Sequence, residues 1–392
     1  MYSKETRIFP WGGRSNYRIP NIIVTNDGTF LAFCNDRKDT SVDHAEEVSL
    51  VLCRKKPGCD WEEVKTLVGV EGWHCAIQNA VYDNEIGKAF IFFGRNPVST
   101  NEFGKFTKEE IAEFERQRDE KAKALGIRRG GFKLTSTDNG ETWEESDFSI
   151  QGVDQEHWNG EILHIAGYGH GSAHGIQLKH SEYKGRLVCP TRVNVKPYVS
   201  FEELRKVAYN NAAYSDDHGE TWQSSKCVQL GTGEGTLLEN GDGSLTYNSR
   251  SYLQNMKRPL ATSTDGGATW HDFRDDKFLI EEKNIGCNAS FIRVGLEEIK
   301  DKSVLPEGAK GVTVFANPRA ENRDNMCCCV SFDEGETYSH VKVIDPGHAA
   351  YSSLEWNPVT QTFCLLYEHG DKNPYNFGIS AVEFDLEWLL SE

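Results

Sequence analysis

The residues most suggestive of chemistry are four aspartates that recur in one eight-residue setting. The string STDNGETW at 136–143 returns as SDDHGETW at 215–222, as STDGGATW at 263–270 and as SFDEGETY at 331–338. A carboxylate in such a setting could act as an acid or base, or it could hold a metal ion. Because one active site needs one set of residues, four copies indicate a repeated unit of architecture instead.

The pattern S-x-D-x-G-x-T-[WY] has a direct structural interpretation. Its acid can accept backbone N–H bonds across a tight turn, its glycine can adopt a positive φ, and its aromatic residue can pack beneath. A carboxylate satisfied by such donors is not available for proton transfer. We therefore interpret the four acids as staples on hairpins and not as catalytic groups: Asp138, Asp217, Asp265 and Asp333.

The eleven cysteines do not follow the spacing of a metal or disulfide framework. Cys327, Cys328 and Cys329 are consecutive, so in a strand they alternate between faces and cannot converge on one ion. There is no CxxC pair, HExxH motif or EF-hand loop, and we expect neither a metal nor another cofactor. We interpret the cysteines as small buried hydrophobes in a reducing compartment. The segment GSAHG at 171–175 lacks the spacing of a nucleophile elbow.

Composition limits the possible partners. The chain has 392 residues, of which 38% are hydrophobic, and a formal net charge of -17. This acidity argues against nucleic acid as a partner, and an anionic substrate would need a local arginine cluster. No run approaches the ~20 apolar residues of a membrane helix, and the first residues lack the apolar run of a secretory signal. We expect a cytoplasmic protein, or a secreted one whose signal peptide is absent from this chain.

The elements that must position any site are mostly strands. Short runs rich in β-branched and aromatic residues are bounded by turn formers, and many lie only two to four residues from the next run. This spacing predicts a meander of antiparallel hairpins and not a βαβ alternation. The runs are at 21–34, 47–55, 88–95, 185–192, 311–318 and 361–368.

Two segments break the strand pattern and predict helices inserted between strands. They are FTKEEIAEFERQRDEKAKALG at 106–126 and SFEELRKV at 200–207. Each opens with the residues of a capping box: Thr107 with Glu110, and Ser200 with Glu203. Either helix could cover the rim of a pocket or lie on the surface without a further role.

The spacing of the repeated acids predicts the architecture. Successive acids lie 79, 48 and 68 residues apart, which fits blades of four strands with loops of variable length. A β-propeller follows, closed on itself, with a central depression where loops from every blade meet.

Longer motifs add a resemblance to a known family. YRIP at 17–20 is followed by the strand NIIV, and later come GHGSAHGIQLKHSEYKGRLVCP, EGTLLENGDGSLTYNSRSY, NPRAENRDNM, AAYSSLEW and CLLYEHGDKNPYNFG. These motifs and their order resemble those of exo-α-sialidases of the retaining type, whose repeats are called Asp boxes. The resemblance runs from about residue 7 to the C-terminus and leaves the segment 106–126 unmatched. It implies an all-β, six-bladed β-propeller in one domain over 1–392, with small helical insertions and a sialylated glycan as substrate.

Carried over onto this sequence, the resemblance implies that Arg18, Arg250 and Arg323 hold the substrate carboxylate. A guanidinium offers a planar fork that matches a carboxylate and stays charged at any working pH. The resemblance also places Arg37 in the pocket as an accessory cation. A salt bridge from Arg37 to a neighbouring loop acid, Asp36 or Asp39, is the alternative.

The resemblance further implies that Tyr351 is the nucleophile and Glu234 its activating base. A phenol suits this substrate because sialic acid carries its own carboxylate at the reacting carbon. Two unit charges ~4 Å apart cost roughly 4 kcal/mol at an effective dielectric of about 20, and a neutral nucleophile avoids that repulsion. We expect the glycines at 231, 233 and 235 to let the backbone approach the ligand.

The acid/base is placed by the resemblance in CNDRKDTSVDHAEEV. We assign Asp43, since DHAEEV resembles the bacterial pattern, and Asp39 is the alternative. Trp73, His74, Gln78 and Asn79 fall where the family lines the pocket for the N-acyl group, or they belong to the core. The open alternatives for function are a hydrolase of a related nonulosonic acid such as Kdn or Kdo, a trans-sialidase, and a non-catalytic glycan-binding propeller. Oligomeric state leaves no signal in the sequence.

Overall fold

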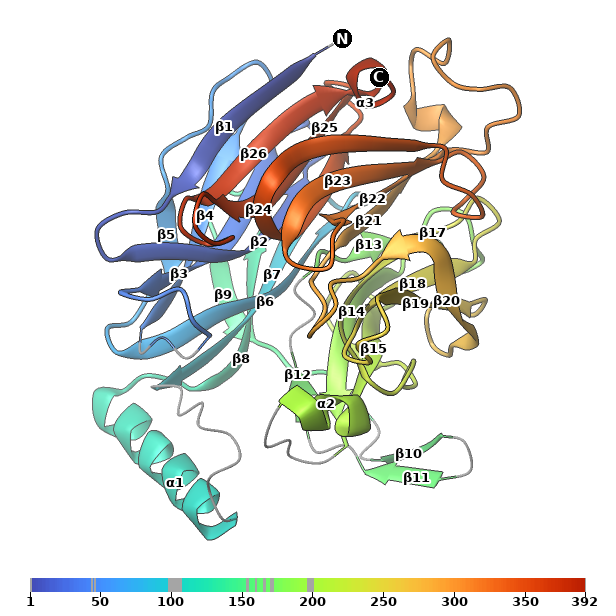
Figure 1. Cartoon of the computed structure of the whole chain (residues 1–392). Coiled ribbons are helices and arrows are strands. Elements are labelled where there is room, and N and C mark those ends of the chain that lie inside the picture. Colours follow the sequence, from blue (N-terminus) through green and yellow to red (C-terminus); the bar gives the residue numbers. More distant parts are fainter. Residues whose placement is uncertain are drawn as a thin grey trace.

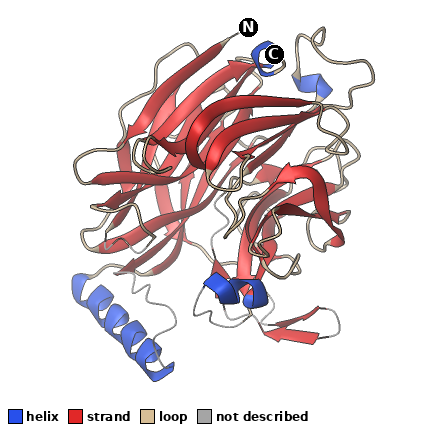
Figure 2. Ribbon diagram, in the orientation of Figure 1, coloured by secondary structure: helices blue, strands red, loops and turns tan. Residues whose placement is uncertain are grey.

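The computed structural model describes residues 2–43, 45, 47–97, 108–152, 155–158, 161–164, 167–169, 173–195 and 201–391. Figure 2 shows that strands make up most of the molecule and that the helices lie at its periphery. The strands form curled antiparallel sheets, which run in chain order around the molecule in Figure 1.

The first half of the described chain forms one large sheet and part of a second. The large sheet has the order β2-β3-β4-β6-β7-β8-β9, with β5 on β4: β2 (Ser15–Val24), β3 (Phe30–Lys38), β4 (Val48–Lys55), β5 (Lys65–Val68), β6 (Trp73–Asp83), β7 (Lys88–Pro97), β8 (Gly130–Ser136) and β9 (Glu144–Asp147). Within it, β4 and β6 share only one parallel pair of residues, Val48 and His74. That single pair marks the boundary between two groups of antiparallel strands.

The middle of the chain forms smaller sheets. One contains β12 (Gly167–Gly169), β13 (Ile176–Gln177), β14 (Leu187–Asn194), β15 (Ala208–Ser215) and β16 (Gln223–Ser224). The next contains β17 (Thr232–Glu239), β18 (Leu245–Ser251), β19 (Lys257–Ser263) and β20 (His271–Ile280). A separate hairpin consists of β10 (Gln155–Trp158) and β11 (Glu161–His164).

The last sheet closes the chain on itself. Its order is β1-β26-β25-β24-β23-β22-β21: β1 (Ser3–Pro10), β26 (Gly378–Asp385), β25 (Thr362–Gly370), β24 (His340–Asn357), β23 (Asp324–Ser331), β22 (Val312–Pro318) and β21 (Ser290–Val294). The first strand therefore pairs with the last, as when Ser3 faces Phe384. Strand β24 is long enough to pair with β23 along its first part and with β25 along its second.

The strands nearest the centre contact one another in a closed ring. β24 contacts β2, β2 contacts β6, β6 contacts β13 and β14, β14 contacts β17, β17 contacts β21, and β21 contacts β24 again. This ring is the geometry of a β-propeller, and it confirms the predicted all-β propeller fold. The predicted number of six blades stays a prediction, because two of the described sheets run continuously through more than one group of strands.

Three helices and a short 3₁₀ turn (Leu296–Glu298) complete the described elements: α1 (Lys108–Leu125), α2 (Phe201–Val207) and α3 (Leu386–Leu389). Helices α1 and α2 confirm the two predicted insertions. Their predicted capping residues Thr107 and Ser200 lie outside the described residues. None of the helices in the described ranges is long and apolar enough to cross a membrane.

The repeated acids staple hairpins as predicted. In the first copy Asp138 Oδ1 accepts from the backbone N–H of Thr142 (2.9 Å) and from the Ser136 hydroxyl (2.8 Å), and Asp138 Oδ2 accepts from the Thr142 hydroxyl (2.6 Å). Gly140 has a φ of 79°, which a residue with a side chain rarely adopts. The same contacts of the acid recur in the other copies, at Asp217, Asp265 and Asp333.

The cysteines are buried, with Cys59 as the exposed exception. Cys328 packs in one hydrophobic cluster with Val314, whereas its neighbour Cys329 packs in another with Phe291. The alternation predicted for consecutive cysteines in a strand is therefore confirmed.

Candidate active site

Three of the predicted arginines converge on the predicted tyrosine. Arg18 lies on β2, Arg250 on β18 and Arg323 just before β23, and their guanidinium carbons lie 5.6, 5.7 and 5.4 Å from the centroid of the Tyr351 ring. Tyr351 itself is only 5% exposed. Cations from three distant parts of the sequence thus surround one buried phenol.

Shifts in the strand register orient several of the site side chains. The register of β2 shifts between Arg18 and Asn21, that of β17 shifts between Thr232 and Gly235, and that of β24 shifts around Tyr351. A β-bulge re-directs a side chain that a regular strand would point elsewhere. Arg18, Glu234 and Tyr351 each lie within such a shift, so the inner strands are bent where their site residues leave the sheet.

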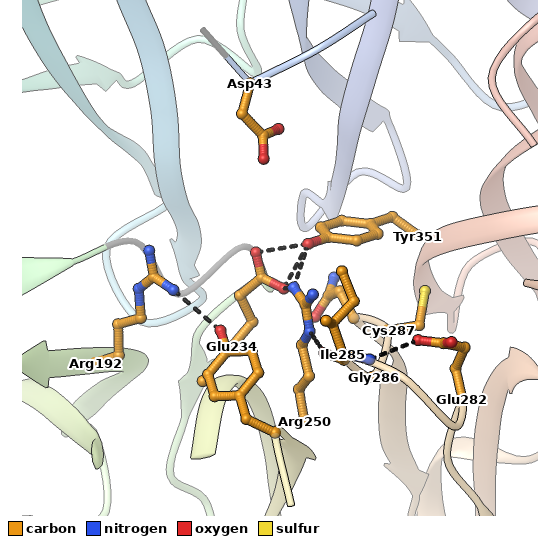
Figure 3. A network of polar contacts seen from close by, with 12 residues as sticks. Asp43, Arg192, Glu234, Arg250, Glu282, Ile285, Gly286, Cys287 and Tyr351 are labelled. Atoms are coloured by element: carbon orange, nitrogen blue, oxygen red, sulfur yellow. Dashed lines mark hydrogen bonds and ion pairs between the residues drawn. The ribbon is translucent and has the colours of Figure 1, made fainter. Parts of the chain in front are cut away.

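The phenol and the glutamate are in direct contact, as Figure 3 shows. The Tyr351 hydroxyl donates to Glu234 Oε2 at 2.6 Å and lies 2.8 Å from Oε1, and Arg250 Nη1 donates to the Tyr351 oxygen at 2.6 Å. Arg250 also forms an ion pair with Glu234. These contacts form a closed triangle of acid, phenol and cation.

The triangle perturbs both of its titratable members. Burial raises the pKa of Tyr351 well above its ordinary value of 10; the Arg250 cation opposes this rise and Glu234 adds to it. Burial alone would also raise the pKa of Glu234, but the cations Arg250 and Arg192 and the hydrogen bond from Tyr351 lower it below 4.5. The resting pair is therefore a neutral phenol beside an ionised carboxylate.

Two glycines that flank Glu234 make room for buried tyrosine side chains. A Cβ atom at Gly233 would lie 2.1 Å from the Tyr252 hydroxyl, and one at Gly235 would lie 2.2 Å from the Tyr247 ring. These glycines make room for tyrosine side chains that pack against β17, and the expected approach of the backbone to a ligand stays a prediction.

Arg37 and Asp43 join the site. Arg37 is buried and its Nη1 lies 2.9 Å from Asp43 Oδ1, while the Asp43 side chain is 70% exposed. Burial tends to raise the pKa of Asp43, but the guanidiniums of Arg37, Arg18 and Arg250 outweigh it and lower that pKa. Asp43 thus lies at the solvent-exposed side of the arginine cluster.

The two loop acids considered as partners of Arg37 have other partners. Asp39 accepts from the exposed Arg14, whose Nη2 lies 2.8 Å from Oδ2. Asp36 accepts from Lys38 and from the hydroxyl of Ser15. The described polar contacts of Arg37 are with Asp43 and with the Ser41 carbonyl, and its role as a pocket cation stays a prediction.

The residues expected near an N-acyl pocket divide between two environments. Trp73 is fully buried in the hydrophobic core, so the core interpretation holds for it. Gln78 and Asn79 line a cavity of about 160 Å³ between sheets, together with Thr191 and Trp222. Burial and the nearby Arg37 cation lower the pKa of His74 to about 4, which keeps that imidazole neutral.

Sequence reasoning missed a buried counter-charge, Glu368 on β25. Its Oε1 accepts from Arg18 Nε (2.6 Å) and from the backbone N–H of Ile19 (2.8 Å), and its Oε2 accepts from the backbone N–H of Tyr351 (3.3 Å). Ile19 has a φ of 64°, a costly conformation for a β-branched residue. A signal was present, because an acid inside the apolar run TFCLLYEHG requires a buried cation.

Tyr375 was also missed. Its ring lies 4.0 Å from the Arg18 guanidinium, and its hydroxyl accepts from Arg323 Nη1 at 2.6 Å. One tyrosine thus fixes two of the three arginines around Tyr351. Tyr375 lies in the segment CLLYEHGDKNPYNFG that carries part of the resemblance, but that segment does not indicate which arginines Tyr375 contacts.

The arrangement suits an anion. Positive charge is in excess across the site. The guanidiniums of Arg18, Arg37, Arg250 and Arg323 face three carboxylates, those of Asp43, Glu234 and Glu368, and Arg192 adds a further cation near Glu234. The described residues contain no group of His, Cys, Asp or Glu side chains that could hold a metal ion. A ligand carboxylate would neutralise the excess.

Comparisons with known proteins agree with this geometry. Residues 96–361 match the family described as BNR repeat-like domain. A sialidase of Micromonospora viridifaciens is 29% identical over 385 residues, which is 96% of this chain and 52% of that protein. A sialidase of Bacteroides fragilis is 27% identical, over 90% of this chain and 60% of that protein. This chain therefore spans about half to three fifths of the length of these relatives.

A solved structure supports the fold. The Hadza microbial sialidase Hz136 superposes with a TM-score of 0.72 at 22% identity, covering 96% of this chain and 66% of that chain. The resemblance to sialidases predicted from the sequence is confirmed by these matches. The roles of the individual site residues are not tested by them and stay predictions.

Proposed function

This chain belongs to the family of BNR repeat-like domains, and from that premise we propose that it is an exo-α-sialidase. It would remove terminal sialic acid from glycoconjugates with retained configuration. The observation that carries the proposal is the convergence of three guanidiniums, each 5.4 to 5.7 Å from the ring of a buried tyrosine that is hydrogen-bonded to a glutamate. Such a floor fits a sugar whose reacting carbon bears a carboxylate.

The arginines would hold that carboxylate. Among the described residues, Arg18 and Arg250 make their hydrogen bonds through Nε and Nη1, so the Nη2 groups are available to a ligand. Arg323 is fixed by Tyr375 and by the Gly286 carbonyl. The cations are therefore oriented before the substrate arrives, which reduces the entropy cost of binding.

Tyr351 would attack the anomeric carbon. As its oxygen forms the new bond, its proton passes to Glu234, which is already in contact with the hydroxyl. Arg250 donates to the same oxygen and would stabilise the charge that develops there. The bond to the leaving sugar breaks in the same step, and its oxygen takes a proton from Asp43.

Water would complete the reaction. Asp43 takes a proton from the water, the new oxygen bond forms at the anomeric carbon, the bond to Tyr351 breaks, and Glu234 returns its proton to the phenol. Asp43 must first hold a proton as an acid. The arginines lower its pKa in the free protein, and a substrate carboxylate would offset their charge and raise that pKa.

Product identification tests the proposal. We would incubate the protein with α2,3- and α2,6-linked sialosides and a Kdn-linked analogue and follow the anomeric signals by NMR. The expected result is free sialic acid released first as the α-anomer. A β-anomer would contradict retention, an anhydro or transferred product would indicate a trans-sialidase, and release from the Kdn substrate alone would indicate a different nonulosonic acid. Binding without turnover would indicate a glycan-binding propeller.

A further inference from the structure

A second cation lies beside the proposed base. Arg192 on β14 approaches Glu234 from the side opposite to Arg250 (Figure 3). Its Nη1 donates to the hydroxyl of Tyr252 at 3.2 Å. Neither residue has a part in the mechanism above.

Tyr252 fixes this cation. Its side chain is only 4% exposed, and its ring lies 5.2 Å from the Arg250 guanidinium. Its hydroxyl occupies the space beside Gly233 where any Cβ atom would clash, at 2.1 Å. Tyr252 is thus packed against the strand that carries Glu234 and holds Arg192 at a set position.

The charges around Glu234 show why a second cation would matter. Arg250 on β18, Arg192 on β14 and the hydroxyl of Tyr351 on β24 face this buried carboxylate, and the two cations with the Tyr351 hydrogen bond lower its pKa against the effect of burial. Arg250 is also one of the three arginines proposed to bind the substrate carboxylate. When the substrate carboxylate binds to Arg250, its negative charge offsets part of the stabilisation that Arg250 gives to the Glu234 carboxylate. The stabilisation by Arg192 is not offset in this way.

We propose that Arg192, held by Tyr252, is a positioning residue that keeps Glu234 ionised and directed at Tyr351 while the substrate occupies Arg250. This inference rests on the proposed function. It assigns to Arg192 a role in the pH dependence of the reaction and not in contact with the reacting atoms.

The test compares pH profiles of kcat/KM for Arg192→Gln, Arg192→Lys and Tyr252→Phe with a matched control, Arg293→Gln, whose arginine pairs with Glu334 away from this site. In Arg192→Gln, the fall of kcat/KM at low pH (the acid limb of the profile) should move to higher pH. At a pH below this limb, the activity of the variant relative to the unaltered protein should then be lower by about threefold or more, which is the loss that a displacement of half a pH unit produces. Arg192→Lys should keep the limb of the unaltered protein, and Tyr252→Phe should show a smaller displacement in the same direction.

Two results would overturn the inference. One is a profile of Arg192→Gln that superposes on the unaltered protein after scaling, since a purely structural role lowers activity at every pH equally. The other is an equal displacement for Arg192→Gln and Arg192→Lys. If Arg192→Gln does not fold, the Arg192→Lys and Tyr252→Phe variants still test the proposal. A pH profile that is unchanged in Tyr252→Phe but displaced in Arg192→Lys, which keeps the charge, would contradict a role for the charge of Arg192.

Failure of the proposed function is distinguished by a measurement that needs no turnover. The carboxyl carbon of Glu234 would be titrated by ¹³C NMR in the ligand-free protein, with Glu234→Gln for assignment. An inactive protein in which Arg192→Gln raises the pKa of Glu234 would reject the sialidase but keep the electrostatic role of Arg192. An unchanged titration would reject that role whatever the activity.

Discussion

The hairpin staples and the candidate active site both hold carboxylates as anions, but the partners of these carboxylates lie at very different separations along the sequence. All donors to Asp138 lie within four residues of it in the sequence. Glu234 is held by Arg250, 16 residues away, and by Tyr351, 117 residues away. Glu368 accepts from Arg18 across 350 residues. The staple is complete once a hairpin forms, whereas the site exists only when the whole ring has closed.

The two regions also lie at opposite ends of the blades. Ser263, which begins the third repeat, pairs with Leu245 at the start of β18, and Arg250 lies near the end of that strand. Ser215 likewise pairs with Leu187 at the start of β14, while Arg192 is five residues further along. Substitutions should therefore separate stability at one end from chemistry at the other.

The largest effect is expected for Tyr351→Phe. Losing the nucleophile should lower turnover by about three orders of magnitude, because no other group in the triangle can take its place without adding a charge beside the substrate carboxylate. Steady-state kinetics would measure the loss, and calorimetry should still detect binding of a sialic acid analogue. Turnover within tenfold of the unaltered protein would remove the assignment of the nucleophile.

Asp43→Asn and Asp39→Asn form a matched pair within one loop. Asp43 pairs with the pocket cation Arg37, whereas Asp39 pairs with the exposed Arg14. We expect about a hundredfold loss of kcat/KM for Asp43→Asn, as for the loss of a general acid and base, and little change for Asp39→Asn. The reverse order would identify Asp39 as the acid/base.

Arg323→Ala should weaken binding of a sialic acid analogue by about 2 kcal/mol, or roughly thirtyfold, the value of a hydrogen bond to a charged group. Titration calorimetry would measure it. Arg274→Ala, which removes an exposed cation paired with Asp272, is the control for a general loss of positive charge. Equal affinities for the two variants would argue against the arginine cluster as the carboxylate site.

A staple should show the opposite behaviour. Asp138→Ala removes the acceptor of three hydrogen bonds in a half-exposed turn, and we expect the free energy of unfolding to fall by about 1 kcal/mol with unchanged kcat/KM. Thr137→Ala, one residue away on the exposed side of the turn, should change neither quantity. Loss of catalysis in a folded Asp138→Ala protein would mean that the two regions are coupled.

The smallest expected effect is a pH dependence of the difference in stability between the unaltered protein and a variant that lacks the Asp138 carboxylate. Hydrogen bonds from Thr142 lower the pKa of Asp138 from 3.8 to about 2. A carboxyl with a lowered pKa in the folded state stabilises the protein above its ordinary pKa, and that stabilisation is lost as the pH falls. The gap in stability between the unaltered protein and Asp138→Asn should thus hold above pH 3.8 and shrink toward about pH 2, as denaturant titrations would show. A stability difference between the two proteins that grows as the pH falls would contradict the lowered pKa of Asp138.

The separation along the sequence between interacting residues also explains which features could be predicted from the sequence. The two inserted helices and the staples depend on neighbours a few residues apart, so periodicity and turn chemistry were sufficient to place them. The strands were placed less precisely: the run at 21–34 contains the end of β2, a turn and the start of β3. The arginines and Tyr351 were placed only by resemblance to a family, since any single arginine in such a sequence would be an ordinary surface cation.

The rest of the site depends on contacts that no local pattern encodes. Tyr375 fixes Arg18 and Arg323 from the segment CLLYEHGDKNPYNFG, which carries part of the family resemblance but does not show which residues Tyr375 contacts. No glycine marks the shift in register between Ala349 and Ser352 that contains Tyr351. Glu368 was the exception in principle, because a charge within an apolar strand predicts a buried partner. Which partner it would be could be known only from the closed ring.

In the proposed reaction the buried phenol of Tyr351 becomes covalently attached to the sugar. The direct measurement is to trap the intermediate with a fluorinated sialic acid that slows its hydrolysis, and then to locate the adduct by peptide mass spectrometry. We expect one added sugar per chain on Tyr351, and none in Tyr351→Phe. An adduct on Glu234 or Asp43, or full turnover with inversion and no adduct, would contradict it.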